Sequence, residues 1–189
     1  MAISAIIIGS MFLIKTNHKK SKSILTLRTA PITLYSQPEA PKIFKLNDSY
    51  RPLFYIKRNN YIEKNDCIID PATALMWQKN RESKPMRFHH ANTYIDELND
   101  MQYLGFRNWR LPTVEELSSL IEPEKINNLY IDPVFRHIKG SYWSIDTLAV
   151  KTPFGSRTNA AWGVDFRFGY IFWSYLEAEN FVRGVRSTE

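Results

Sequence analysis

The sequence predicts a mixed α+β domain over residues 61–189, for three reasons. An apolar hairpin pattern comes first, two amphipathic helix patterns follow it, and the rest of the chain alternates as β-strands do. All five tryptophans of the 189-residue chain lie between Trp77 and Trp173. A stretch of this size can bury most of its surface without cross-links. We therefore expect two helices packed on a small antiparallel sheet, with tryptophan side chains in the core.

The first element is a predicted β-hairpin. Cys67–Ile69 and Leu75–Trp77 are short apolar runs, and Asp70–Thr73 lies between them. Aspartate accepts backbone hydrogen bonds and proline fixes φ, so this tetrapeptide has the chemistry of a turn.

Two helices are predicted next. The apolar stripe of the first has the spacing of one helix face and consists of Phe88, Ala91, Ile95 and Leu98. Gly105 is a suitable stop for it. The second helix is expected to start at Thr113, because Glu116 three residues later completes the spacing of a capping box, and Pro123 ends it. Its buried stripe is expected to be Val114, Leu117, Leu120 and Ile121.

The last third of the chain is predicted to be rich in strands. Tyr142–Ser144 has strand character, and Ala161–Phe166 alternates large apolar residues with small or polar ones, which predicts a half-buried strand. Arg167–Gly169 is expected to turn the chain into a strand at Tyr170–Trp173. A final strand is predicted at Phe181–Arg186.

Charge and cysteine content exclude several classes of function. The formal net charge is +6, but residues 1–30 carry five basic residues and no acid, which leaves 20 basic against 19 acidic residues in the rest. A nucleic-acid-binding domain usually carries its basic face within the folded part, so no nucleic-acid partner is expected. The single cysteine, Cys67, excludes an intrachain disulfide and a cysteine-based zinc site. His89 and His90 are adjacent on a predicted helix and do not share a face, so no metal site is expected there.

The first 60 residues are predicted to precede the domain. Residues 1–30 form an apolar and then basic tail, in which Ala2–Ile14 has the character of a signal segment or membrane tether, although thirteen residues are too few to span a bilayer. A mis-assigned start is the alternative. Residues 31–60 contain four prolines and are expected to be a poorly packed lead-in. Short strands near Ile43–Leu46 and Leu53–Ile56 are compatible with their sequence.

Five segments occur in the order found in one protein family. They are DPATALMWQK at residues 70–79, NWRLPTVEEL at 108–117, YWS at 142–144, AWGVDF at 161–166 and FVRGVR at 181–186. In this order they resemble the Lcl C-terminal domain family, which comprises the C-terminal domain of the Legionella collagen-like adhesin and its bacterial relatives. The tryptophan-arginine-leucine-proline-threonine run with its following glutamate is the most diagnostic piece.

The resemblance implies a fold related to C-type lectins and a role in binding, because the adhesin domain recognises sulfated polysaccharides. Family members often join a cysteine of the first helix to a cysteine of the closing motif, and those positions correspond here to Ile95 and Gly184. The turn glycine of the opening motif is replaced by Ala74, which is strained if its φ is positive. The calcium-site motifs of true C-type lectins are missing, so calcium-dependent sugar binding is not expected.

Candidate ligand-binding residues are loop arginines and aromatic residues outside the motifs. Anions such as sulfate are best held by charge-assisted hydrogen bonds, and ligand contacts are commonest on loops. The candidates are Arg107, Arg157, Arg167, Trp173 and Tyr175. For each arginine, a solvated surface charge is the alternative. The motif tryptophans are assigned to the core, namely Trp77, Trp109, Trp143 and Trp162. Arg110 is expected to be buried and paired with an acid such as Asp165, with ligand binding as the alternative.

These expectations define a non-catalytic binding or adhesion module for glycans or sulfated polyanions. A structural or protein–protein interaction domain of a bacterial envelope protein is the alternative. An enzyme is not expected, because the sequence has no phosphate loop, zinc motif or nucleophile elbow, and Cys67 has no evident base. No cofactor is expected. The location expected is exported or membrane-associated, with a cytoplasmic one left open.

Overall fold

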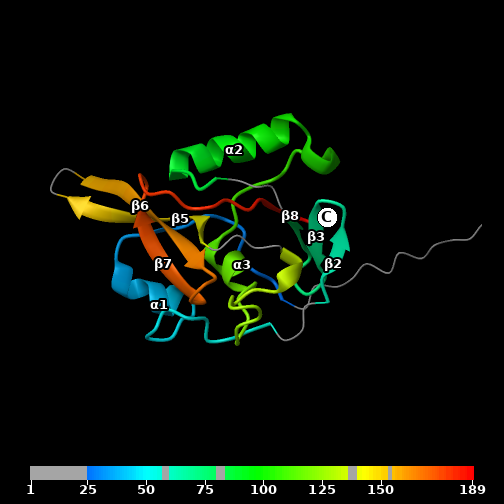
Figure 1. The fold of residues 1–189 in the computed structure, drawn as a ribbon. Coiled ribbons are helices and arrows are strands. Elements are labelled where there is room, and N and C mark those ends of the chain that lie inside the picture. The colour runs from blue at the N-terminus through cyan, green and yellow to red at the C-terminus, as the bar shows by residue number, and fades with distance from the viewer. Residues whose placement is uncertain (1–24, 57–59, 80–83, 136–139, 153–154) are drawn as a thin grey trace, which may run out of the picture.

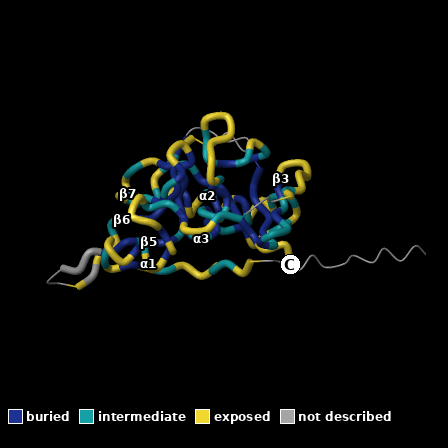
Figure 2. Tube along the Cα trace, turned by 90° about the horizontal axis from the view of Figure 1, so that it is seen from below, coloured by how far each residue is buried: buried dark blue, intermediate teal, exposed yellow. Residues whose placement is uncertain are grey.

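The computed structural model describes residues 25–56, 60–79, 84–135, 140–152 and 155–189. Within these residues the chain forms two four-stranded sheets and several short helices, which confirms the predicted α+β class (Figure 1). Helix α2 (Phe88–Asp100) lies along one side of the molecule, and α1 (Ala40–Ile43) lies near β6 and β7 on another side. Buried backbone gathers between these elements, and exposed turns surround it (Figure 2).

The larger sheet has the strand order β1-β5-β6-β7. Its strands are β1 (Thr33–Leu34), β5 (Ser141–Thr152), β6 (Gly155–Asp165) and β7 (Tyr170–Tyr175). Strand β1 runs parallel to β5, and the other neighbours are antiparallel. The centre of β6 is buried on both faces, because Trp162 and Val164 face one hydrophobic cluster while Ala161 faces another. The expectation of a half-buried strand at Ala161–Phe166 is therefore wrong.

The smaller sheet has the order β2-β3-β4-β8, with antiparallel neighbours throughout. Its strands are β2 (Ile62–Lys64), β3 (Cys67–Asp70), β4 (Leu75–Gln78) and β8 (Val185–Ser187). The β3–β4 hairpin confirms the first predicted element. In its turn, Asp70 accepts hydrogen bonds from Ala72 N at 2.9 Å and from Thr73 Oγ1 at 2.7 Å. Strand β8 is shorter than predicted, because Phe181 makes only an isolated bridge to Tyr142.

The first predicted helix is present as α2, with Ala91, Ile95 and Leu98 buried. It ends at Asp100, before Gly105, because the chain turns sharply at residues of left-handed conformation. These are Gln102 and Leu104, with φ of 51° and 54°, and they form the short 3-10 turn η2 (Tyr103–Gly105).

The second predicted helix is the short α3 (Val114–Ser118), and it contains the capping box. Thr113 Oγ1 accepts a hydrogen bond from Glu116 N at 3.2 Å, and Glu116 Oε2 accepts one from Thr113 N at 2.9 Å. Leu120 and Ile121 are buried as expected, but they lie in the tight turn that follows α3. A further 3-10 turn, η3 (Pro133–Phe135), places Phe135 in the interior.

The tryptophans are divided between two hydrophobic clusters, one on each face of β6. Trp77 and Trp162 lie in the first cluster, and Trp109 and Trp143 lie in the second. Each is at most 2 % exposed. The four tryptophans are in the interior as expected, but they do not share one core, because the sheet has a separate hydrophobic cluster on each face.

The segment expected to be a poorly packed lead-in is part of the first cluster. Its buried side chains are Leu34, Ala40, Phe44 and Leu46. The Phe44 ring meets the edge of the Trp162 ring at a centroid distance of 5.3 Å. Neither Ile43–Leu46 nor Leu53–Ile56 forms a strand; instead the segment contains β1, the 3-10 turn η1 (Gln37–Glu39) and α1. Hydrophobic contacts with residues more than 100 positions away determine its structure, and no local pattern reveals them.

Within the described residues, no helix is both long enough and apolar enough to cross a bilayer. The predicted signal or tether segment, Ala2–Ile14, lies outside the described residues.

The two positions at which the resemblance implies a disulfide face each other. A Cβ atom on Gly184 would lie 3.5 Å from Ile95 Cδ1 and 3.3 Å from Leu98 Cδ1. Ile95 and Leu98 both belong to the second cluster. The isoleucine side chain therefore fills space beside the small glycine, and apolar packing stands where a cross-link would otherwise join α2 to the C-terminal segment.

Ala74 has a φ of 55°, which is the left-handed conformation. Its carbonyl accepts hydrogen bonds from Thr188 N at 3.0 Å and Thr188 Oγ1 at 3.1 Å, so the turn is held to the C-terminus. A residue with a Cβ is strained at this φ, whereas glycine is not. Because φ of Ala74 is positive, the backbone at this alanine is strained.

We predict that Ala74→Gly stabilises the protein by about 0.5–1 kcal/mol, because relief of backbone strain outweighs the greater flexibility of glycine in the unfolded chain. Thermal and urea unfolding measure the change. Ala72→Gly is the matched control in the same turn, where φ is not positive, and it should lower stability by a similar amount. A loss of stability in both variants would contradict the assignment of strain to Ala74.

Candidate functional site

Several of the buried charged groups are engaged in structural interactions. Asp146, on β5, is 0 % exposed and accepts hydrogen bonds from Arg28 Nη1 and Nη2 at 2.8 and 2.7 Å, from Ile32 N at 2.9 Å and from Val114 N at 2.7 Å. Arg28 also pairs with Glu115, on the first turn of α3. This network joins the start of the described chain, β5 and α3, and its geometry is that of an anchor.

Arg110 pairs with Glu116 and not with Asp165. Its two terminal nitrogens donate to Glu116 Oε2 at 2.6 Å and Oε1 at 2.5 Å, so the carboxylate of the capping box also neutralises the arginine. Asp165 instead accepts from Arg167 Nε at 3.1 Å and Arg167 N at 2.8 Å. The expected Arg110–Asp165 pair is therefore wrong: Arg110 is paired with the acid Glu116 instead, and its side chain is half-buried, with 26 % exposed.

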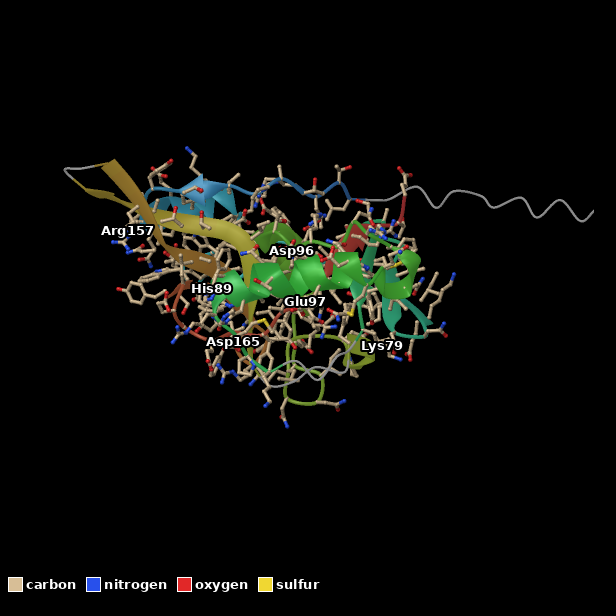
Figure 3. All side chains as sticks on the ribbon, turned by 90° about the horizontal axis from the view of Figure 1, so that it is seen from above. Lys79, His89, Asp96, Glu97, Arg157 and Asp165 are labelled. Carbon is tan, nitrogen blue, oxygen red and sulfur yellow. The ribbon has the colours of Figure 1, made fainter. Side chains whose placement is uncertain are left out.

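The three candidate arginines do not form a shared anion site. Arg157 lies near one end of β6, and Arg167 follows the other end, after Asp165 (Figure 3). At 3.3 Å per residue, positions 157 and 165 are roughly 25 Å apart along the strand. Arg107 is exposed on the loop before Trp109, where its neighbour Asn108 accepts from Arg186 Nε at 2.7 Å, beside the smaller sheet. Arg157 and Arg167 therefore do not line one compact anion pocket.

The two candidate aromatic residues line a groove along β7. Two adjoining hollows, of about 330 and 260 Å³, share Gln37 and Trp173. We name this surface the β7 groove, and its principal side chains are Tyr35, Gln37, Asp48, Asn159, Trp173 and Tyr175. Tyr175 is 60 % exposed and Tyr35 is 51 % exposed, so large aromatic surfaces are available to a ligand.

The floor of the β7 groove is positioned by the sheet. Trp173 is the cross-strand partner of Trp162, and it packs partly on the first cluster. The Trp173 and Tyr175 rings are 5.5 Å apart and nearly perpendicular, at 87°. This edge-to-face contact holds Tyr175 beside Trp173, because such geometry is favourable for aromatic pairs.

One wall of the groove is a turn fixed to the outer edge of β7. Asn47 Oδ1 accepts hydrogen bonds from Ser49 N at 2.9 Å and from Arg51 N at 3.0 Å, which closes the turn. The carbonyl of Tyr50 then accepts from Ile171 N at 2.8 Å. Asp48 is therefore on a turn that backbone hydrogen bonds hold next to the strand.

No sequence pattern indicated that residues 35–50 contribute to a binding site. Tyr35, Gln37 and Asp48 supply half of the principal groove side chains, yet they belong to the segment expected to pack poorly. The Asn-Asp-Ser turn at residues 47–49 was a visible signal, since asparagine closes turns through its side chain. Its position beside β7 depends on pairing across more than 100 residues, which a local pattern does not contain.

Residues considered for catalysis or metal binding lie apart from the β7 groove. Cys67 is buried, and burial raises the pKa of its thiol, which disfavours the reactive thiolate. His89 and His90 are exposed on α2, with ring centroids 3.8 Å apart. Across the described part of the chain, no group of three or more histidine, cysteine, aspartate or glutamate side chains is placed to hold a metal ion.

The fold and the groove define a class: a mixed α+β domain with two packed cores and an aromatic surface groove on an edge strand. The model of the Lcl C-terminal domain family matches residues 66–186, so the chain belongs to that family. Membership indicates an adhesin-like bacterial domain. No curated protein and no solved structure shows significant similarity to the chain.

Proposed function

We propose that this protein is a non-catalytic adhesion module that binds glycans through the β7 groove. The observation that carries the proposal is the cluster of Tyr35, Trp173 and Tyr175 around the hollow of about 260 Å³. Aromatic rings bind the apolar faces of sugar rings and hydrogen-bonding side chains beside them bind hydroxyl groups, as in other concave ligand sites. Membership of an adhesin-related family supports the same role.

The rigidity of the groove supports binding without a large ordering cost. Trp173 and Tyr175 are on a strand, and Asp48 is on a turn that is hydrogen-bonded to that strand. A pre-organised surface loses little conformational entropy when the ligand arrives. The proposed glycan-binding role includes the relation to C-type lectins that the family resemblance implies.

The non-catalytic part of the proposal is supported by the engagement of the charged groups. Asp146, Glu116 and Arg110 are held in ion pairs that connect structural elements. Among the described side chains that line the β7 groove, Asp48 is the one carboxylate. An acid-base pair of the kind required for glycoside hydrolysis is not assembled there.

An exported or surface-associated location follows from the proposed adhesion role. Ala2–Ile14 would then serve as a signal segment or tether. Fractionation of cells producing the full chain tests this location, and recovery only in the cytosolic fraction would contradict it.

A protein partner is the alternative, and one observation favours it. A second groove of about 330 Å³ contains apolar side chains, among them Leu25, Phe44 and Phe54, beside as many polar ones, and Phe54 is 78 % exposed. Exposed apolar surfaces of this kind can mark contacts with other proteins. This groove lies apart from the β7 groove and shares none of its lining residues.

The proposal is tested with a glycan array and the full chain. We predict that the natural sequence binds at least one class of immobilised glycan and that Tyr175→Ala weakens binding by about tenfold or more, the effect expected of a central aromatic contact. Phe54→Ala is the matched control, because it removes an exposed aromatic ring outside the β7 groove, and its glycan binding should be unchanged. Thermal unfolding confirms that both variants are folded.

Two results would contradict the proposal. One is the absence of binding to any glycan by the natural sequence. The other is equal glycan binding by the natural sequence and the Tyr175→Ala variant. If Phe54→Ala instead abolished capture of a defined protein partner while glycans had no effect, the alternative role would be supported.

A further inference from the structure

The charge of the β7 groove is unlike that of a site for sulfated ligands. Among the described residues that line it there is one carboxylate, Asp48, and no lysine or arginine. A sulfate group is best held by charge-assisted hydrogen bonds from arginine or lysine. A carboxylate at the same place repels it and so selects against it.

The arginines nearest the groove along the chain have other positions or partners. Arg51 follows the turn, but its guanidinium stacks on Tyr130 at 4.3 Å and its Nε donates to Gly169 O at 3.2 Å. Arg167 is paired with Asp165. Arg157 comes two residues before Asn159 on β6 and does not line the groove.

The lining offers instead the chemistry of uncharged sugars. Gln37 and Asn159 carry amides, which can donate to and accept from hydroxyl groups, and the Asp48 carboxylate can accept from them. Trp173 joins the two hollows, so the aromatic surface continues from one to the other. Groove residues run along β7 from Tyr170 to Tyr175, a span of roughly 17 Å at 3.3 Å per residue, which is longer than one sugar ring.

One wall of the groove lies outside the region that defines the family. The family model begins at residue 66, whereas Tyr35, Gln37 and Asp48 come before it. The selectivity of the groove is therefore a property of this chain's own N-terminal segment combined with β7.

We propose that the β7 groove binds an uncharged, linear oligosaccharide, with sugar rings stacked on Trp173 and Tyr175 and hydroxyl groups bonded to Gln37, Asn159 and Asp48. This inference rests on the proposed glycan-binding function and specifies its ligand class. The residues that come before the family region set the preference, because they supply the carboxylate and one of the two amides.

The test compares uncharged hexasaccharides with a sulfated polysaccharide on the full chain. The probes are cellohexaose, maltohexaose, chitohexaose and heparin, each measured by isothermal titration calorimetry at low and at high ionic strength. We expect at least one uncharged hexasaccharide to bind with an affinity that changes less than twofold with salt, since no ion pair is involved. Tyr175→Ala and Gln37→Ala should each weaken that binding, by about tenfold for Tyr175 and severalfold for Gln37.

Variants of charged residues distinguish binding in the β7 groove from binding at the arginines. Arg157→Ala should leave hexasaccharide binding unchanged, because Arg157 does not line the groove. Asp48 is on an exposed turn, and Asp48→Lys should weaken binding of the uncharged hexasaccharide and allow salt-sensitive binding of heparin. The thermal unfolding midpoints of these surface variants should match that of the natural sequence.

The outcomes are distinguishable. If heparin binds, is released by salt and is weakened by Arg157→Ala while the uncharged probes do not bind, glycan binding stands and the inference about charge is overturned. If an uncharged probe binds equally well to the Tyr175→Ala variant, the placement in the β7 groove is overturned. If neither the four probes nor the wider glycan array gives binding, the proposed function fails and the inference fails with it.

Discussion

Replacing Asp146 with alanine is expected to lower the free energy of unfolding by about 3–5 kcal/mol, because it leaves two backbone amides and part of the Arg28 guanidinium without an acceptor. Asp146 accepts two hydrogen bonds from the Arg28 guanidinium and two from backbone amides, those of Ile32 and Val114. The alanine variant cannot replace any of them. Each buried donor left without a partner costs about 1–3 kcal/mol.

The position of Asp146 explains why one side chain has so large an effect. The Val114 amide is the first of α3, so the carboxylate also satisfies the N-terminus of that helix. The Ile32 amide directly precedes β1, so the same group fixes the segment that pairs with β5. We expect urea and thermal unfolding of Asp146→Ala to show both a lower midpoint and early loss of the N-terminal packing.

Glu115→Ala is the matched control for this prediction. Glu115 contacts the same Arg28, but its side chain is 23 % exposed, and partly exposed ion pairs contribute about 1 kcal/mol or less. The loss in Glu115→Ala should therefore be several times smaller. Equal losses in the two variants would show that the Arg28 contact alone, and not the buried backbone hydrogen bonds of Asp146, determines stability.

A double variant, Ile95→Cys with Gly184→Cys, is expected to form a disulfide on oxidation and to gain about 4 kcal/mol over its reduced form. The estimate follows from closing a loop of about 90 residues, which restricts the unfolded chain. The two positions are adjacent across α2 and the C-terminal segment, since a Cβ on Gly184 would lie 3.5 Å from Ile95 Cδ1. Comparison of urea unfolding with and without reductant measures the gain.

The cross-link must be identified, because Cys67 is in the same cluster. A Cys67→Ala background removes the competing thiol, and peptide mass spectrometry then shows whether residues 95 and 184 are joined. Gly184→Cys alone is the control, and it should be slightly destabilised, since the new Cβ would lie 3.3 Å from both Leu98 Cδ1 and Trp109 Cε3. An oxidised double variant no more stable than its reduced form would contradict the geometric match.

The elements predictable from sequence were those with local signals. The β3–β4 hairpin, helix α2 and the capping box of Thr113 and Glu116 each depend on residues within about a dozen positions. Two of the five family motifs, at residues 70–79 and 108–117, lie in the hairpin and at the capping box, and the match over residues 66–186 confirms the resemblance. Local periodicity and capping thus predicted the α+β class, and the resemblance of the ordered motifs indicated the family.

The parts that sequence reasoning missed depend on distant contacts. Phe44 becomes a core residue because it meets Trp162, and the two-residue strand β1 exists because it pairs with β5. The separation of Arg157 from Arg167 follows from the length of β6. Half of the β7 groove was missed for the same reason, while Trp173 and Tyr175 were chosen as candidates because they lie outside the family motifs.

The turn at residues 47–51 has a consequence for self-association. Strand β7 is at the edge of its sheet, and an edge strand can recruit the same strand of a second molecule into a continuous intermolecular sheet. The Tyr50 carbonyl occupies the outward amide of Ile171, so the strand is blocked at that point. The same turn that forms the wall of the groove therefore also hinders edge-to-edge pairing of this aromatic strand with a second molecule.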